Sequence, residues 1–299
     1  MSARHAFRFG VVTATARTPE EWTERARRIE SLGYSTMAMP DRVQYTLSPL
    51  PALAAAAAAT RTLRVGTYVI ANDFRNPVLL AKDTATLDVL SGGRFELGLG
   101  AGTPMAEDSR MLGIPFGSGR ERLERLEESL LLLKRLWAGE QVTAAGGPYP
   151  VEGAQVTPRP VQQPHPPILL AAGTRRTLEL AAREADAVAL SIQPTDPVAA
   201  IEEKVGWLRE AAGRRFDELE LNVNLMAVGD QVPTFVRLRL ELTPEKLARM
   251  GAFPVLSGST EEMCGTLQRW RERFGISYVM VGDELMEAMA PVVERVAGR

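Results

Sequence analysis

The sequence contains very little cysteine and histidine, and this excludes several kinds of site. Among its 299 residues there are one cysteine, Cys264, and two histidines, His5 and His165. A disulfide within the chain is impossible, and neither a cysteine-rich nor a multi-histidine metal site can be built. A Ser-His-Asp triad would depend on His165, which lies between two prolines, or on His5 near the start. We therefore expect no metal, and we expect an organic cofactor to carry the chemistry.

The sequence also lacks a surplus of charge and a long apolar run. Its 35 basic and 37 acidic residues give a net charge of −2, so we expect neither a nucleic-acid nor a membrane partner. The longest alanine run, Ala54–Ala59, is far shorter than the roughly 20 residues that span a bilayer. The segment Met1–Arg8 is polar and does not resemble a signal peptide. Together with the scarcity of cysteine, this predicts a cytoplasmic protein.

Strand and helix patterns alternate along most of the chain. The predicted strands cover Phe7–Thr13, Ser35–Met39, Leu63–Ala71, Arg94–Gly100, Ile168–Ala172, Ala187–Ile192, Leu219–Val228 and Ser277–Val281. The predicted helices cover Pro19–Leu32, Pro51–Thr60, Pro77–Leu90, Gly119–Ala138, Arg175–Glu184, Asp196–Gly213, Thr260–Phe274 and Glu284–Ala297. This α/β order predicts a (β/α)8 TIM barrel that forms a single domain over residues 1–299. An open, doubly wound sheet is the alternative.

Two segments interrupt the alternation. Seven prolines fall between Pro148 and Pro167, so this stretch cannot be regular helix. We expect a proline-rich insertion that runs over the surface after the fourth helix. A second, irregular insertion is expected at residues 229–258, after the seventh strand, with a short helix near Pro244–Met250.

Several predicted strands are followed by residues that could bind a ligand, since barrel enzymes place their sites at these strand ends. Gly98–Gly102 would let a ligand approach the backbone, or would form a tight turn. Gly173–Arg176 offers helix N–H groups, a hydroxyl and two guanidiniums to a phosphate, or is a cap with solvated arginines. Asp41-Arg42 follows the second predicted strand, and the ordinary interpretation of such a pair is an ion pair or a turn. Tyr45 and Tyr68 contact substrate, or pack at the barrel rim.

A series of motifs in a fixed order carries a family resemblance. They are Gly33-Tyr34, Arg64–Thr67, Asn76-Pro77, Ala81-Lys82, Thr86–Gly102, Pro158–Gln162, Pro166–Ile168 and Ala181–Asp186. Over residues 7–215 the chain resembles the bacterial luciferase-like superfamily of flavin- and F420-dependent oxidoreductases. The segment Ala71–Pro77 is most similar to the F420-dependent branch.

The resemblance implies a barrel that binds coenzyme F420, or alternatively FMN, at the carboxyl ends of its strands. It implies a cis peptide bond between Tyr68 and Val69, the ring edge against the backbone at Ala71-Asn72, and the phosphate near Gly173-Thr174. The cofactor-binding residues that it implies are Asp41, Tyr68, Val69, Ala71, Asn72, Gly100, Ala101, Gly102, Gly173, Thr174, Arg175 and Ser191.

Two positions depart from the F420-dependent alcohol dehydrogenases of this family. Those enzymes carry a histidine base where this chain has Arg42, and an acid where it has Thr103. Arg42 cannot act as a base, but its guanidinium can hold an anionic or carbonyl oxygen. We therefore predict a reductase that transfers hydride from F420H2 to an activated C=C, C=N or C=O bond of a small molecule. Tyr45, Tyr68 or Glu107 would supply the proton, and the predicted catalytic residues are Arg42, Tyr45, Thr103 and Glu107.

Two further hypotheses remain open. The chain could be an FMNH2-dependent monooxygenase that uses oxygen and a separate partner reductase. It could also be a barrel that has lost its cofactor and serves as a non-catalytic binding protein or subunit. The resemblance also implies a homodimer formed through the helices after strands two and three, where Ala52–Ala59 suits close helix contact.

Overall fold

A computed structural model describes residues 5–44, 46–102 and 106–299 of the chain. The chain divides into two compact units, which are described separately. The N-terminal unit consists of Ala14–Ala26 and Ala38–Ala171, and the C-terminal unit consists of Met1–Thr13, Arg27–Met37 and Ala172–Arg299.

The N-terminal unit is built on parallel strands. Its strands are β3 (Arg64–Thr67), β4 (Ile70–Ala71) and β5 (Phe95–Gly100), followed by β8 (Ile168–Ala172) at the border of the unit. Both β3 and β4 pair with β5, and β5 pairs with β8. All six residues of β5 are buried, as expected for a strand covered on both faces. Strand β2 (Thr36–Met39) precedes them in the chain.

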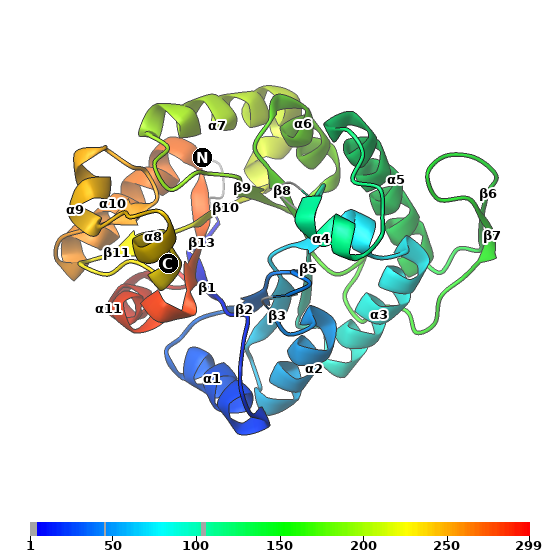
Figure 1. The fold of residues 1–299 in the computed structure, drawn as a ribbon, viewed down its shortest axis with the longest axis horizontal. Coiled ribbons are helices and arrows are strands. Elements are labelled where there is room, and N and C mark those ends of the chain that lie inside the picture. The colour runs from blue at the N-terminus through cyan, green and yellow to red at the C-terminus, as the bar shows by residue number, and fades with distance from the viewer. Residues whose placement is uncertain (1–4, 45, 103–105) are drawn as a thin grey trace. The chain divides into compact units, whose positions relative to one another are not determined.

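Helices cover the strands of this unit (Figure 1). They are α2 (Pro49–Ala59), α3 (Pro77–Leu90) and α5 (Gly119–Trp137), with the shorter α4 (Ala106–Met111) and the 3-10 turn η1 (Asn72–Phe74). Helix α3 has its predicted bounds because Asn76 accepts a hydrogen bond from Val78 N at 2.9 Å and Pro77 occupies the first turn. Helix α4 was not predicted.

The single strand predicted over Leu63–Ala71 is wrong. The chain forms β3 and β4 instead, and the break between them contains the Tyr68–Val69 peptide bond. Pairing with β5 stops at Gly66↔Glu96 and resumes at Ile70↔Leu99. Hydrophobic alternation alone does not reveal such a break, because apolar residues lie on both sides of it.

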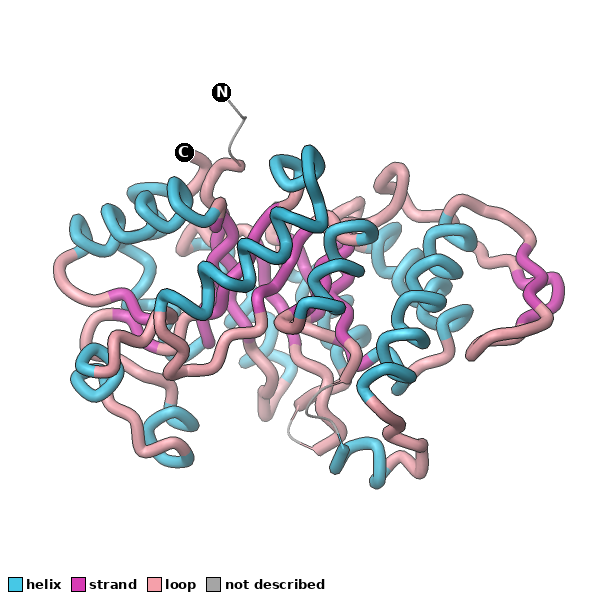
Figure 2. The backbone as a smooth tube through the Cα atoms, turned by 90° about the horizontal axis from the view of Figure 1, so that it is seen from above, coloured by secondary structure: helices cyan, strands magenta, loops and turns pink. Residues whose placement is uncertain are grey.

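An antiparallel hairpin that the sequence did not predict leads from α5 into the proline-rich insertion. Strands β6 (Val142–Ala144) and β7 (Val151–Ala154) pair with each other and stand apart from the other strands (Figures 1 and 2). The segment that follows is fixed to α3 by the buried Asp88 carboxylate. This carboxylate accepts hydrogen bonds from Val161 N at 2.7 Å, Gln162 N at 2.9 Å and Gln162 Nε2 at 2.6 Å.

The C-terminal unit also carries parallel strands. They lie in the order β1 (Arg8–Val12), β13 (Ile276–Gly282), β10 (Glu220–Asn224) and β9 (Ala187–Leu190). The longer helices are α6 (Arg175–Glu184), α7 (Val198–Ala212), α10 (Thr260–Phe274) and α11 (Met286–Val296), and the 3-10 turns are η2 (Gly213–Glu218) and η3 (Asp283–Leu285). Helix α1 (Pro19–Ser31) lies at the border of the two units.

Residues that begin and end α10 show why its bounds follow from the sequence. Ser259 and Glu262 form a reciprocal capping box, and Gly275 ends the helix with a positive φ of 83°.

The irregular insertion after β10 has a small core of its own. It contains β11 (Ala227–Val228), α8 (Thr234–Arg239), α9 (Pro244–Arg249) and β12 (Val255–Leu256). Ala227, Val236 and Leu247 form its buried centre. The continuous strand predicted over Leu219–Val228 is therefore wrong, because β11 leaves the main strands and pairs with β12.

Neither a membrane span nor a metal cluster is found in the part of the chain that the structure describes. Within residues 5–44, 46–102 and 106–299, no helix combines the length and apolar character needed to cross a bilayer. In the same ranges, no group of three or more His, Cys, Asp or Glu side chains is placed to hold a metal ion.

Candidate active site

The predicted site residues of the N-terminal unit follow the carboxyl ends of β2, β4 and β5. Asp41 and Arg42 follow β2, Asn72 follows β4, and Ala101 and Gly102 follow β5. Parallel strands present these ends on the same edge of a sheet. Tyr45 and Thr103, which were predicted to be catalytic, lie outside the described residues.

Asp41 holds the chain segment that leaves β4. Its carboxylate is buried, forms a two-point ion pair with the Arg75 guanidinium, and accepts a hydrogen bond from Ala71 N at 3.3 Å. The ion pair satisfies a charge that would otherwise be costly to bury. Asp41 thus fixes the backbone at Ala71.

Arg42 forms an ion pair with the buried carboxylate of Asp108 on α4. The Nη2–Oδ2 distance is 2.9 Å, and the other carboxylate oxygen accepts a hydrogen bond from Val43 N at 2.8 Å. Glu107, which we predicted as a proton donor, is exposed on the same helix. The acid that contacts Arg42 is therefore the adjacent Asp108, which the sequence analysis missed.

The peptide bond between Tyr68 and Val69 is cis, as the family resemblance implied. Tyr68 donates its backbone N–H to Met39 O at 2.6 Å. Burial raises the pKa of the Tyr68 phenol above its ordinary value, so this hydroxyl keeps its proton at neutral pH.

The glycines of β5 make room for this same segment. A Cβ added to Gly98 would lie 1.9 Å from Thr67 O, and one added to Gly100 would lie 3.0 Å from a Val69 methyl group. Gly102 has a φ of +78°, which suits a tight turn. Gly98 and Gly100 are thus needed for close strand packing, while the adjacent Ala101 O accepts a hydrogen bond from Arg122 Nε at 3.1 Å.

The amide of Asn72 lies at the start of η1 and is fully buried. Its Nδ2 donates to the hydroxyl of Tyr149 at 2.9 Å, and its Oδ1 has no hydrogen-bond partner among the described residues. The neighbouring Asp73 forms a two-point ion pair with Arg125, with distances of 2.8 and 2.6 Å. Tyr149 comes from the loop of the β6–β7 hairpin, and neither it nor Arg125 was among the predicted residues.

The C-terminal unit holds the predicted phosphate site at the start of α6. Thr174 caps this helix, and the N–H groups of Gly173 and Thr174 donate to the Thr177 hydroxyl at 3.1 and 3.0 Å. Gly173 packs against Ser191, since an added Cβ would lie 2.7 Å from the Ser191 Cβ. Two backbone N–H groups here thus converge on one oxygen atom, as they would on an anion.

The charged side chains beside this turn point to different partners. Arg175 is exposed and forms an ion pair with Glu210, at 2.9 and 3.0 Å. Lys204 donates to Ser191 O at 2.8 Å and to Asp196 at 3.1 Å. The sequence analysis did not single out Lys204, because it lies in the middle of a predicted helix.

Both histidines lie before strands, at the ends opposite to these residues. His5 precedes β1, and His165 precedes β8, where its ring lies 5.8 Å from that of Trp137. Neither histidine thus lies at the strand ends that carry the predicted site residues.

Comparison with known proteins identifies the family. Residues 5–234 match the family described as luciferase-like monooxygenase. The chain belongs to this family. The predicted membership is thus confirmed, over a longer stretch than the motifs alone covered.

Individual relatives match the chain to different extents. An F420-dependent glucose-6-phosphate dehydrogenase of Beutenbergia cavernae is 36% identical over 165 residues, which are 52% of this chain and 48% of that protein. The chain thus spans about half the length of this dehydrogenase. An uncharacterised protein of Mycobacterium tuberculosis is 34% identical over 242 residues, covering 78% of this chain and 77% of that one.

A solved structure confirms the predicted fold class. The F420-dependent tetrahydromethanopterin reductase from Methanopyrus kandleri matches with a TM-score of 0.78 and 19% identity, over 98% of this chain and 99% of that one. The chain is therefore a (β/α)8 barrel, and the open-sheet alternative is wrong.

Proposed function

We propose that the chain is an F420-dependent oxidoreductase that reduces an activated C=C, C=N or C=O bond of a small molecule. The observation that carries this proposal is the Arg42 guanidinium, held by Asp108 after a barrel strand at which no histidine lies. A fixed cation can stabilise negative charge that develops on a substrate heteroatom, but it cannot remove a proton from an alcohol. The F420-dependent names of the dehydrogenase and the reductase above support the choice of cofactor.

Each unit offers groups that fit one part of a cofactor with a polar ring and a phosphate. The buried Asn72 Oδ1 lacks a protein donor, and the N–H groups of Gly173 and Thr174 converge on one hydroxyl oxygen. In the N-terminal unit, Ala71 and Asn72 would hold the ring. In the C-terminal unit, the N–H groups of Gly173 and Thr174 would donate to a phosphate. The reduced deazaflavin, when bound, supplies a hydride.

The protein's own groups would do the remaining chemistry. Arg42, oriented by Asp108, would hold the substrate oxygen or nitrogen on which negative charge develops. The Tyr68 hydroxyl, which burial keeps protonated at neutral pH, would be the proton donor. Asp41 would keep the backbone at Ala71 in place through its own hydrogen bond.

Turnover under anaerobic conditions tests the proposal. Purified protein is mixed with F420H2 and with enones, imines and ketones, and the return of oxidised F420 absorbance is followed. We expect oxidation of F420H2 that depends on the acceptor, and a loss of at least about tenfold in Arg42→Gln, as for removal of a group that stabilises transition-state charge. Arg120→Gln, at an exposed position on α5, is the control.

The competing functions give different results in this assay. An FMNH2-dependent monooxygenase would leave F420H2 unchanged in the anaerobic assay, and in a separate aerobic assay with FMNH2 it would convert the substrate to an oxygenated product. A non-catalytic barrel would show neither reaction.

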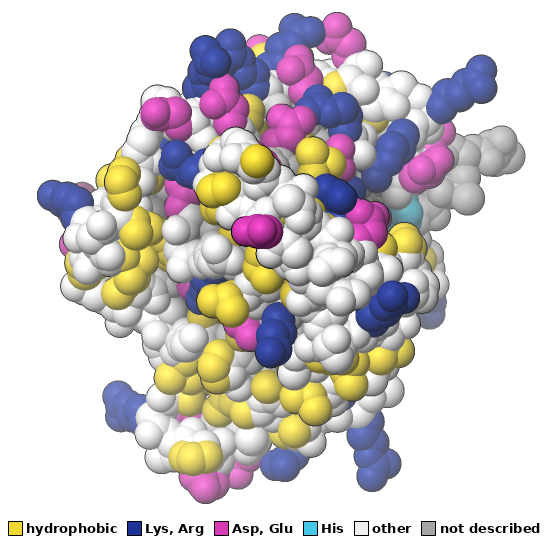
Figure 3. Space-filling view, turned by 90° about the vertical axis from the view of Figure 1, so that its right-hand side faces the viewer, with side chains coloured by type: hydrophobic (Ala, Val, Ile, Leu, Met, Phe, Trp, Pro, Cys, Tyr) yellow, Lys and Arg dark blue, Asp and Glu magenta, His cyan; other side chains and the backbone are white. Residues whose placement is uncertain are grey.

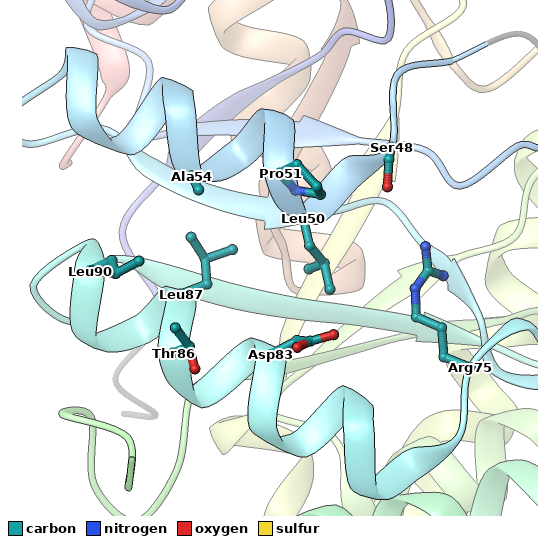
Figure 4. A pocket seen from close by; sticks show the side chains of 9 residues that line it. All are labelled: Ser48, Leu50, Pro51, Ala54, Arg75, Asp83, Thr86, Leu87 and Leu90. Atoms are coloured by element: carbon teal, nitrogen blue, oxygen red, sulfur yellow. The ribbon is translucent and has the colours of Figure 1, made fainter. Parts of the chain in front are cut away.

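The same proposal includes a homodimer formed through α2 and α3. Leu79 and Leu90 on α3 are 61% and 69% exposed, and apolar side chains gather on the lower part of the face shown in Figure 3. A groove of about 350 Å³ lies between the two helices (Figure 4). Its lining residues are Ser48, Leu50, Pro51, Ala54, Arg75, Asp83, Thr86, Leu87 and Leu90. Exposed apolar area of this kind is typical of a protein interface.

Sedimentation velocity at micromolar concentration tests the dimer. We expect a dimer for the wild type and for Leu131→Glu, which changes an exposed leucine on α5. We expect a monomer for Leu90→Glu, since a charge would be buried at the proposed contact. A wild-type monomer would contradict the dimer without affecting the proposed reaction.

A further inference from the structure

The Asn72 side chain is held in one place by contacts on both sides of it. The preceding residue, Ala71, donates its N–H to the buried Asp41 carboxylate at 3.3 Å. The following residue, Asp73, is fixed by its two-point ion pair with Arg125. Asn72 itself is only 1% exposed and directly follows β4. In barrels of this class, ligands bind at such strand ends.

The two ends of the amide are distinguished by their neighbours. Nδ2 lies 2.9 Å from the Tyr149 hydroxyl and 3.4 Å from Asp73 Oδ1. The Asp73 carboxylate, in its ion pair with Arg125, can only accept hydrogen bonds. If the amide were flipped, two acceptor oxygens would face each other. The NH2 end is therefore directed at Asp73 and Tyr149, and Oδ1 at the opposite side.

Tyr149 is held in position by the hairpin that carries it. Its backbone N–H donates to Glu128 Oε1 at 3.1 Å, which ties the hairpin loop to α5. Burial and the nearby Asp73 charge raise the pKa of Tyr149 to about 12. The hydroxyl is therefore neutral at physiological pH and accepts the hydrogen bond from Asn72.

The consequence is a buried acceptor, Asn72 Oδ1, without a donor among the described residues. Folded proteins rarely leave a buried acceptor unpaired, because its lost hydration is not replaced. A ligand that brings a donor removes this cost. The rings of deazaflavins and flavins both carry an imide N–H between two carbonyl groups, which is a donor of the required kind.

We propose that Asn72 Oδ1 accepts the hydrogen bond of the imide N–H of the bound ring, and that Tyr149 is a positioning residue that orients the amide. This inference rests on the proposed function, since it requires that a deazaflavin or flavin binds. It assigns one hydrogen bond of the ring to Asn72 Oδ1, adds Tyr149 as a positioning residue, and gives the β6–β7 hairpin a role in cofactor binding.

The direct test compares the cofactor with its analogue methylated at the imide nitrogen. Binding is measured by ligand fluorescence, without turnover. For the wild type we expect the methylated cofactor to bind about tenfold more weakly, because one buried hydrogen bond is lost. In Asn72→Leu we expect weaker binding of the natural cofactor and no difference between the two ligands. The same pattern is expected with F420 or with FMN, because both carry the imide.

Two further variants separate orientation from folding. Tyr149→Phe keeps the ring but removes the hydroxyl that holds the amide, so we expect it to reduce the discrimination between the two ligands several-fold. Glu152→Gln changes an exposed side chain on β7 of the same hairpin, so we expect it to leave the discrimination at the wild-type value.

Equal binding of natural and methylated cofactor by the wild type would overturn the inference while leaving the proposed function intact. Discrimination that persists in Asn72→Leu would overturn it in the same way. Failure of the wild type to bind either F420 or FMN would overturn the inference and the proposed function together.

Discussion

The ion pair between Asp41 and Arg75 offers a quantitative test of how the end of β4 is held. Asp41→Asn keeps the shape of the side chain but removes its charge. It also places an NH2 group against the donors of Arg75 and Ala71, so at least one of the three hydrogen bonds is lost. Arg75 then remains without its carboxylate partner.

The structure sets the expected size of the effect. Breaking a fully buried ion pair by removing one partner costs about 3–5 kcal/mol. Here the Asp41 side chain is 7% exposed but that of Arg75 is 23% exposed, so water can solvate part of the guanidinium. We therefore expect Asp41→Asn to lower the free energy of unfolding by about 2–3 kcal/mol, below the fully buried value.

A double-mutant cycle in denaturant measures the interaction itself. Asp41→Asn, Arg75→Gln and the double variant are unfolded under the same conditions, and we expect a coupling energy of about 1.5 kcal/mol or more. The control cycle uses Arg120 and Glu124, whose side chains are 77% and 53% exposed and whose coupling should stay below about 0.5 kcal/mol. A coupling for Asp41 and Arg75 no larger than that of the control would refute the reasoning.

Three other predictions concern packing, the insertion and pH. Gly98→Ala should lower the free energy of unfolding by about 3 kcal/mol or more, because the added Cβ would overlap Thr67 O. Gly206→Ala, which has open space around it in α7, should raise the free energy of unfolding by about 0.5–1 kcal/mol. Equal melting temperatures for the two variants would contradict this. Asp88→Ala should cost about 3 kcal/mol in denaturant, because three hydrogen bonds to the proline-rich insertion are lost; a loss below about 1 kcal/mol would contradict the anchoring role. The pKa of Tyr149 is about 12 in the folded chain and about 10 when unfolded, so the unfolded state ionises first and stability should fall as the pH rises from 10 to 12. Tyr149→Phe should lose less stability over that interval in thermal melts, and an identical decline would argue against the raised pKa.

Elements with local signals could be predicted from the sequence. The bounds of α3, α6 and α10 were correct because caps and helix-compatible spacing lie within each segment. The short helices α4 and α8 were missed, since six residues hold too few turns for a periodic pattern. Helix α9 is equally short but was predicted, and Thr243 caps it while Pro244 occupies its first turn. The β6–β7 hairpin was hidden because its strands are three and four residues long and lie beside prolines.

Those features of the candidate site that lie within one short segment of the chain could be predicted from the sequence. The resemblance correctly implied the cis bond between Tyr68 and Val69. It could not show that Asp108 rather than Glu107 contacts Arg42, because the two acids are adjacent and the orientation of α4 decides which is buried. Tyr149 lies 77 positions from Asn72 in the chain, and no local pattern connects them.

The measurement that tests the central claim most directly is a titration of the purified protein with F420 and, separately, with FMN, followed by ligand fluorescence. The account predicts saturable F420 binding that is tighter than FMN binding. A preference for FMN would contradict the deazaflavin assignment and favour the oxygen-using alternative. Binding of neither ligand would show that the barrel has been retained without the cofactor chemistry of its family.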